Sequence, residues 1–205
     1  MSRQVYHHII DVSIVSTQIL KMRHWRLNCI IMNNLQKQTF AKKQLLNATL
    51  SLLSTKNIKE ISISQITILA QVGRATFYRN FKSIEDILYQ YENNLADEFD
   101  SYYKSINNKN ISTLLYEISK HYLENKEFYT ILYKQQLTKI IENTIQNRIK
   151  NSIVPQTDIE KYGLSFLSYG LYGWIIAWIK DSMKDSPEKL LTMMKAYYSN
   201  PFKIE

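Results

Sequence analysis

The sequence predicts an all-α protein, and three observations support that prediction. The 205 residues include only four glycines and three prolines, the residues that most often interrupt helices. No stretch alternates apolar and polar residues between evenly spaced turns, as a β-rich chain would. Apolar residues instead recur at intervals of three and four, with capping residues ahead of them. We therefore expect helices over residues 39–54, 63–70, 74–80, 83–104, 111–124, 126–135, 136–152, 158–182 and 187–199.

The charge of the chain is unevenly distributed. The formal net charge is +8. Residues 37–91 contain eight basic and three acidic residues, whereas residues 92–205 contain fourteen of each. Residues 1–31 add a further excess of three positive charges. A basic segment joined to a neutral one is the electrostatic pattern of a domain that binds a polyanion and is attached to a second domain with another task.

Residues 61–88 contain the most specific pattern, two short helices separated by a tight turn and followed by a longer helix. Ser62 and Gln65 have the spacing of a capping box, so the first short helix is expected to begin just after Ser62. Gly73 is expected to relieve backbone strain in the turn. Apolar side chains at helical spacing are expected to face inward: Ile63, Ile66, Leu69 and Ala70.

The second short helix has one apolar and one polar face. Phe77 and Phe81 are four residues apart and are expected to anchor this helix to the core. The remaining side chains, which include two arginines, can reach phosphates and base edges when such a helix lies in the major groove of DNA. The residues of this outer face are Arg74, Ala75, Thr76, Tyr78, Arg79 and Asn80.

The segment Val72–Lys82 is similar to the V-x-x-x-T-[LF]-Y-x-[HY]-F-x motif of the TetR family of bacterial transcriptional regulators. The resemblance extends over residues 39–88. It implies a three-helix, helix-turn-helix DNA-binding domain over residues 37–88 and a helical ligand-binding and dimerisation domain over residues 89–205. The sequence departs from the family at four positions, which hold Thr67 for Ala, Gln71 for Gly, Asn80 for His or Tyr, and Ile84 for a phosphate-binding Lys.

The resemblance and the basic charge together predict a transcriptional regulator, expected to be a repressor that binds a palindromic operator as a homodimer and is released by a small-molecule effector. Arg74 and Arg79 are the candidates for base contacts. The alternative is a co-regulator that acts mainly through a partner protein and binds DNA weakly, which Ile84 favours slightly. The predicted DNA-binding residues are Thr39, Lys43, Ser62, Ser64, Arg74, Ala75, Thr76, Tyr78, Arg79, Asn80 and Lys82.

Residues 1–36 precede the predicted domain as an N-terminal extension. Two explanations for residues 1–31 stay open, a start codon placed too early, with Met32 as the natural start, or a basic arm that touches DNA. Thr39 is expected to cap the first helix of the domain. Asn57 is expected to take a left-handed conformation after its end.

Residues 162–179 carry no charged side chain and predict a helix buried on more than one side. Its glycines, serines and tyrosines argue against a membrane span. We expect a homodimer interface here, formed with the last helix as a four-helix arrangement. This stretch also resembles the C-terminal domain of regulators linked to dihydroxyacetone kinase. The predicted interface residues are Gly170, Gly173, Trp174 and Trp178.

Aromatic residues are abundant after residue 90 and have two explanations. They line a pocket for a flat or lipophilic effector, or they fill the core and the dimer interface, which is the stronger of the two. The candidate pocket residues are Tyr91, Phe99, Tyr122, Tyr133, Phe166 and Tyr169.

Catalytic and metal-binding motifs are not found in the sequence, so neither an enzyme nor a cofactor or metal site is predicted. The single cysteine, Cys29, excludes an intramolecular disulfide and fits a reducing, cytoplasmic location.

Overall fold

The computed structural model describes residues 34–152 and 154–199, and its regular elements are helices throughout these ranges. The prediction of an all-α fold is confirmed. The calls on residues 1–31, and Cys29 with them, lie outside the described residues. The elements are α2 (Asn34–Leu53), η1 (Ile58–Glu60), α3 (Ile63–Leu69), α4 (Arg74–Asn80), α5 (Ile84–Ser105), α6 (Ile111–Glu124), α7 (Lys126–Lys134), α8 (Lys139–Ser152), α9 (Asp158–Lys180) and α10 (Pro187–Ser199).

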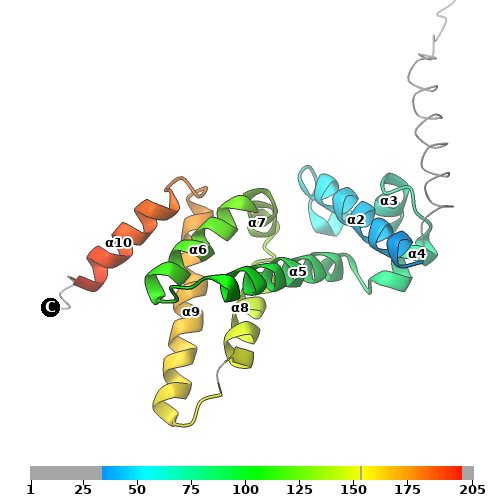
Figure 1. Ribbon diagram of the computed structural model, residues 1–205. Helices are drawn as coiled ribbons and strands as arrows, with labels where there is room; N and C mark the ends of the chain where they lie inside the picture. The colour runs from blue at the N-terminus through cyan, green and yellow to red at the C-terminus, as the bar shows by residue number, and fades with distance from the viewer. Residues whose placement is uncertain (1–33, 153, 200–205) are drawn as a thin grey trace, which may run out of the picture.

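Helix α5 connects two groups of helices (Figure 1). At one end it packs against α2 of the N-terminal unit, which we define as α2, η1, α3 and α4. Towards its other end it packs against α8 and α6 of the C-terminal unit, defined as α6 to α10. The boundary predicted between residues 88 and 89 therefore falls inside one continuous helix.

In the N-terminal unit the core forms where α2 packs against α3, α4 and α5, and it is continuous with the core of the C-terminal unit. Leu45, Ile66, Phe77 and Leu88 are fully buried there, one from each of the four helices. Helix α2 already includes the five residues before Thr39. Thr39 is therefore not a cap, and its hydroxyl donates to the Leu35 carbonyl inside the helix at 3.0 Å.

Three helices end in the same left-handed turn, at residues that are not glycine. After α3, the N–H of Gln71 donates to the Ile68 carbonyl and that of Val72 to the Thr67 carbonyl, which is the Schellman pattern. Gln71 has φ = 55°, whereas Gly73 has φ = −73°. The strain predicted at Gly73 therefore falls on Gln71. The same turn follows α7 at Gln136 and α9 at Ser182.

The prediction for Asn57 is wrong. It has φ = −70° and caps η1 in a capping box with Glu60, because its side chain accepts a hydrogen bond from the Lys59 N–H. Leu69 is also misassigned, since it is exposed while Ile66 and Ala70 are buried. Helix α8 begins at Lys139 rather than 136, because the turn after α7 occupies the residues between.

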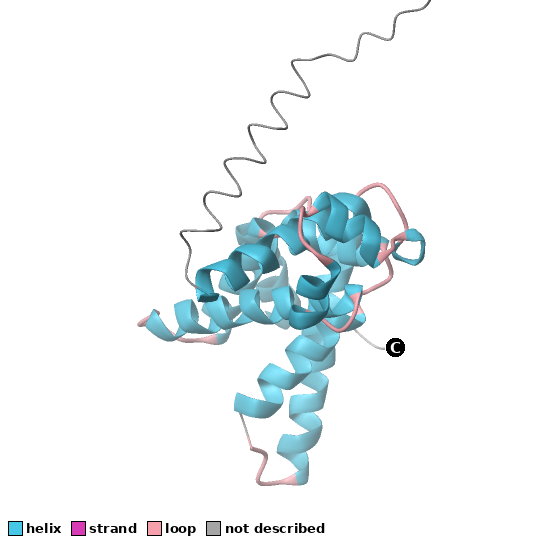
Figure 2. Cartoon of the chain, turned by 90° about the vertical axis from the view of Figure 1, so that its right-hand side faces the viewer, coloured by secondary structure: helices cyan, strands magenta, loops and turns pink. Residues whose placement is uncertain are grey.

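In the C-terminal unit, α8 and α9 lie side by side and extend away from the other helices in both views (Figures 1 and 2). Helix α10 packs against α6, where the Tyr116 hydroxyl donates to Glu188 Oε1 at 3.0 Å. None of the described helices combines the length and the apolar character that a bilayer span requires.

Candidate nucleic-acid interface and sensor core

Helix α3 is held at its start by the predicted capping box. The Ser62 hydroxyl accepts a hydrogen bond from the Gln65 N–H at 3.2 Å, and Gln65 Oε1 accepts one from the Ser62 N–H at 2.8 Å. Ser62 is exposed and Ser64 is partly buried. Thr67, which occupies the family's alanine position, is buried, and its hydroxyl donates to the Ser64 carbonyl at 3.1 Å. The larger side chain is therefore accommodated without an unpaired buried hydroxyl.

Helix α4 is anchored by Phe77 and Phe81, which are both buried with ring centroids 6.1 Å apart. The sequence prediction for these two residues is confirmed. The opposite face of α4 carries Arg74, Ala75, Tyr78 and Arg79, all exposed, with Thr76 partly exposed beside them. A helix of two turns is thus seated on a core and directs two guanidinium groups and a phenol outwards.

Asn80 differs from the rest of the predicted outer face, because its side chain is engaged within the protein. Its Nδ2 donates to the Thr76 carbonyl at 2.7 Å, and its Oδ1 accepts from Gln38 Nε2 at 3.1 Å. Its own carbonyl accepts from Gln90 Nε2 at 3.2 Å. These bonds tie the end of α4 to α2 and α5, which is a structural role that the sequence did not indicate.

Basic side chains flank α4. Lys82 and Lys43 are exposed, as is Thr39. Lys42 is partly buried instead, with Nζ 3.1 Å from Gln90 Oε1 and 5.7 Å from the centroid of the Phe81 ring. Of the two adjacent lysines on α2, Lys43 is therefore the one that is available to a phosphate.

In the C-terminal unit, the structure brings together part of the predicted pocket. Tyr91 lies edge-on to Phe128 at 4.8 Å, and Tyr122 stacks on Tyr129 at 4.1 Å. Phe99 contacts His121, and His121 Nε2 lies 3.1 Å from the Tyr129 hydroxyl. Three of the six predicted residues, Tyr91, Phe99 and Tyr122, thus belong to one aromatic group between α5, α6 and α7, which we call the sensor core.

Phe166 and Tyr169 are far less suited to that role. They are 83% and 57% exposed on α9, although the sequence analysis placed them with the pocket residues. Tyr133 is partly buried and packs against the main core. The sequence showed that α9 is apolar on several faces but not which face points inwards.

Glu92 is a sensor-core residue that sequence reasoning missed. It is 1% exposed, and no described residue donates a hydrogen bond to its Oε2. Burial raises the pKa of this carboxyl from 4.5 to about 7, and interactions with Tyr129 and Arg148 offset only part of that effect. A signal was present, because Glu92 is four residues after the buried Leu88 and three before the buried Leu95, on the apolar stripe of α5.

His121 has the opposite perturbation. Burial lowers its pKa from 6.5 to about 4, and the charge of Asp100 counteracts this only in part. Burial also raises the pKa values of Tyr122 and Tyr129 well above the usual value of a phenol. At neutral pH the core therefore holds a neutral imidazole, neutral phenols and a carboxyl that is close to its midpoint.

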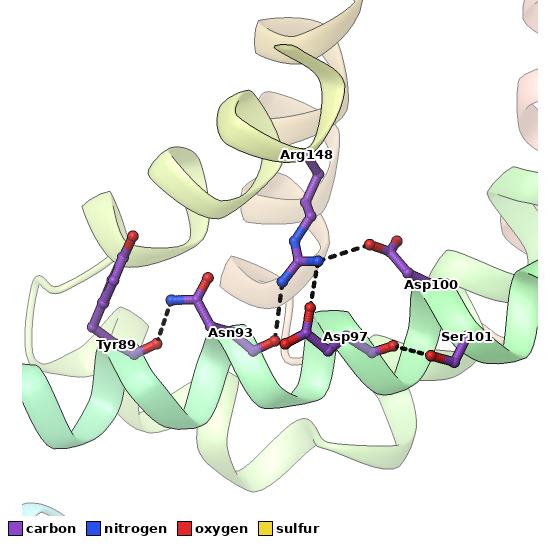
Figure 3. Close-up of polar contacts among 6 residues, drawn as sticks. All are labelled: Tyr89, Asn93, Asp97, Asp100, Ser101 and Arg148. Carbon is purple, nitrogen blue, oxygen red and sulfur yellow. Dashed lines mark hydrogen bonds and ion pairs between the residues drawn. The ribbon is translucent and has the colours of Figure 1, made fainter. Parts of the chain in front are cut away.

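Arg148 joins α8 to α5 beside the sensor core (Figure 3). Its Nη1 lies 2.6 Å from Asp97 Oδ1 and 2.8 Å from Asp100 Oδ2. Its Nη2 donates to the Asn93 carbonyl at 3.1 Å. One guanidinium thus spans two turns of α5, as its planar fork of donors allows.

The outer face of α9 carries a row of apolar and small residues. Ile159 is 86% exposed, and Tyr162, Phe166 and Tyr169 follow it at helical spacing. A Cβ added at Gly163, Gly170 or Gly173 would meet no atom within 4 Å. Trp178, predicted for the same interface, is only 4% exposed and its Nε1 donates to the Asp185 carbonyl, so it belongs to the core of the protomer. Trp174 is partly buried against that core.

Comparison with known proteins finds a different family model for each of the two units. Residues 45–91 match the family model described as bacterial regulatory proteins, tetR family. Residues 109–200 match a model described as transcriptional regulator C-terminal region. Together they cover more than half of the chain. The resemblance to regulators linked to dihydroxyacetone kinase stays a prediction.

The fold is shared with solved structures, among them the following two. Lin0861 from Listeria innocua is 17% identical, with a TM-score of 0.67 over 82% of this chain and 94% of that one. A TetR transcriptional regulator from Streptococcus agalactiae 2603V is 22% identical, with a TM-score of 0.54 over 80% and 94%. No curated protein matches the sequence. Among the residues that the structure describes, no group of His, Cys, Asp and Glu could hold a metal ion.

Proposed function

This chain belongs to the TetR family of bacterial regulatory proteins, and we propose that it is a repressor that binds a palindromic operator as a homodimer and is released by a small-molecule effector. The observation that carries this proposal is the arrangement of α4. Its phenylalanines are buried in the N-terminal unit, while Arg74, Tyr78 and Arg79 point away from it.

The proposed DNA contacts are of two kinds. Arg74 and Arg79 are proposed to contact base edges, because a guanidinium can donate two hydrogen bonds to one guanine in the major groove. Thr76, Tyr78, Lys82 and the start of α3 at Ser62 are proposed to hold phosphates, which set register but carry no sequence information. Thr39, Lys43, Ser64 and Ala75 complete the proposed surface. Asn80 is proposed to support α4 instead, since its side chain is already bonded to α2 and α4.

Dimerisation is proposed to use the outer face of α9. Exposed aromatic residues there are unlike the charged surface of an ordinary solvent-facing helix, and the glycines leave space for the close approach of a second helix. Gly170 and Gly173 remain in the proposed interface. Phe166 and Tyr169 join them in place of the buried Trp178.

The effector is proposed to act on the sensor core, where Tyr91, Phe99 and Tyr122 lie around α5, α6 and α7. Because α5 also packs against α2, a ligand that favours one position of α5 would shift the population of the DNA-binding arrangement.

Titration of the purified protein with duplex DNA from its own locus, at several salt concentrations, tests the proposal. Phosphate contacts predict a steep fall of affinity with salt. Arg79→Ala should weaken specific binding by roughly 1–3 kcal/mol, and Lys82→Ala should lower the salt slope by about one. Lys150→Ala, an exposed lysine on α8, is the control and should change neither. Unchanged affinity in Arg79→Ala, or a flat salt dependence in the wild type, would favour action through a partner protein.

A further inference from the structure

Helix α7 ends beside the N-terminal unit in a turn that fixes one side chain. The Gln136 N–H donates to the Tyr133 carbonyl at 3.1 Å, and the Leu137 N–H donates to the Leu132 carbonyl at 2.8 Å. Gln136 has φ = 59°, the left-handed residue of this Schellman motif. The motif stops α7 at Gln135, its C-cap residue, whose side chain is then free of the helix.

The Gln135 amide makes three hydrogen bonds to the corner between α2 and η1. Its Nε2 donates to the Leu53 carbonyl and to the Lys56 carbonyl, each at 2.8 Å. Its Oε1 accepts from the Ile58 N–H at 2.9 Å. The last carbonyls of a helix and the first N–H groups of the next have no partner within their own helix. One side chain of the C-terminal unit therefore completes two helix ends of the N-terminal unit.

Apolar side chains meet beside this amide, because Leu53 of α2 and Ile131 of α7 belong to the same buried cluster. The same two segments, residues 53–57 and 126–135, line an open groove of about 670 Å³. Of its lining residues, Leu53 and Ile131 are buried, whereas Lys56, Lys126 and Lys134 are exposed. The hydrogen bonds that the structure describes between these two segments are those of Gln135, so we expect the angle between the two units to depend on them.

We propose that Gln135 is a positioning residue that fixes the angle of the N-terminal unit on the C-terminal unit, and through it the separation of the two α4 helices in a dimer. The inference rests on the proposed function, because that separation matters only to a dimer that reads two half-sites. All three bonds belong to one amide, so a displacement of α7 breaks them together. A movement that broke these bonds would expose the amide to the solvent of the groove and change the relative populations of the two arrangements.

Amide hydrogen exchange at Ile58 tests the contact itself and needs no DNA. In Gln135→Ala the Ile58 N–H loses its acceptor, and its exchange should become about five- to tenfold faster. Gln135→Glu keeps the shape but replaces the NH₂ donor by an oxygen facing two carbonyls, so it should show the same increase. Gln146→Ala is the control and should match the wild type, because the Gln146 Nε2 donates to Glu142 Oε1 on its own helix at 3.1 Å.

Half-site spacing tests positioning separately from stability. A duplex selected by the wild type from random DNA is compared with the same duplex lengthened by one base pair between the half-sites. The wild type and Gln146→Ala should prefer the selected spacing, and both Gln135 variants should lose about tenfold of that preference while binding a single half-site as the wild type does.

The outcomes separate the inference from the function. If the wild type selects no duplex, the proposed function fails, and the exchange rate of Ile58 still decides whether the Gln135 contact exists. If both Gln135 variants keep the exchange rate and the spacing preference of the wild type, the inference is overturned. If Gln135→Ala does not fold, Gln135→Glu, which preserves the side-chain volume, decides the matter alone.

Discussion

Glu92 and His121 give the sensor core opposing contributions to the pH dependence of folding. The pKa of Glu92 is raised from 4.5 to about 7 and that of His121 is lowered from 6.5 to about 4, in each case mainly by burial. Both groups are therefore favoured in their neutral form in the folded protein. Their effects on the pH dependence of the free energy of unfolding have opposite signs over almost the same pH range. In the wild type the two effects therefore largely cancel.

The sign for Glu92 follows from proton binding. Between pH 4.5 and about 7 the folded protein holds the Glu92 proton and the unfolded chain does not, so stability falls as the pH rises through this window. A change of one in pKa corresponds to about 1.4 kcal/mol, so the raised value predicts a loss of about 3 kcal/mol by pH 7 and no further loss above it.

For His121, the unfolded chain binds the proton at a higher pH than the folded protein does. Between pH 6.5 and about 4 the unfolded imidazole is protonated while the folded one stays neutral, so stability falls as the pH decreases. The lowered pKa again corresponds to about 3 kcal/mol. In the overlap, from pH 4.5 to 6.5, the two slopes cancel and these two groups leave the wild-type curve nearly flat.

Urea unfolding between pH 4.5 and 8, at one fixed protein concentration, separates the two groups. In Glu92→Gln, which cannot ionise, stability should rise with pH by about 3 kcal/mol up to pH 6.5. In His121→Gln it should instead fall by about 3 kcal/mol up to pH 7. Glu98→Gln is the control and should follow the wild type, because it replaces an exposed carboxylate on α5, the helix that carries Glu92. Parallel curves for the wild type and Glu92→Gln would refute the assignment of a neutral buried carboxyl.

Two further predictions concern helix ends and the outer face of α9. Gln71→Gly should raise the free energy of unfolding by about 1 kcal/mol, because φ = 55° costs a residue with a Cβ more than it costs glycine. Thermal melting checks this, with Gly73→Ala as a contrast that should not stabilise, since Gly73 has φ = −73° and is the N-cap of α4, where Ala is a poorer cap. A lower melting temperature for Gln71→Gly would contradict the turn geometry. Phe166→Glu should weaken the dimer at least a hundredfold in sedimentation experiments, since burial of a Phe contributes about 1.5–3 kcal/mol in each of two symmetric copies. Ile111→Glu, at an exposed position on α6, should leave the dimer intact, and an unchanged dimer in Phe166→Glu would exclude this face.

Local sequence signals account for the parts of the fold that could be predicted. The start of α3 could be predicted because its cap is encoded next to it, and Ser62 accepts the expected hydrogen bond. Ser83, Asn110 and Thr157 accept the equivalent bond at the starts of α5, α6 and α9. The three left-handed turns could not be predicted, because Gln71, Gln136 and Ser182 occupy positions where glycine is the usual signal. In these turns the hydrogen bonds outweigh the preference of a non-glycine residue for a negative φ.

The candidate sites were predictable only where one face of a helix is clearly polar. Helix α4 has such a face, and its division into buried Phe77 and exposed Arg74 and Arg79 follows from the spacing alone. Helix α9 is apolar on most sides, so the sequence could not show that Trp178 points inwards and Phe166 outwards. Gln135 could not be found either, since its partners lie 77 to 82 residues away in the chain.

The polar contacts of α5 explain why the junction at Gln135 is the place where the two units can move. Gln90 on α5 donates to the Asn80 carbonyl at the end of α4 and accepts from Lys42 on α2, so the first turns of α5 are tied to the N-terminal unit. One turn later Arg148 ties α8 to the Asn93 carbonyl, Asp97 and Asp100. Helices α2, α4, α5 and α8 are thus joined in series by charged or amide side chains. Helix α7 contacts α2 through buried apolar side chains, Leu53 and Ile131 among them, and through the Gln135 amide beside an open groove, so a ligand that moves α7 against α5 is expected to act on the Gln135 hydrogen bonds.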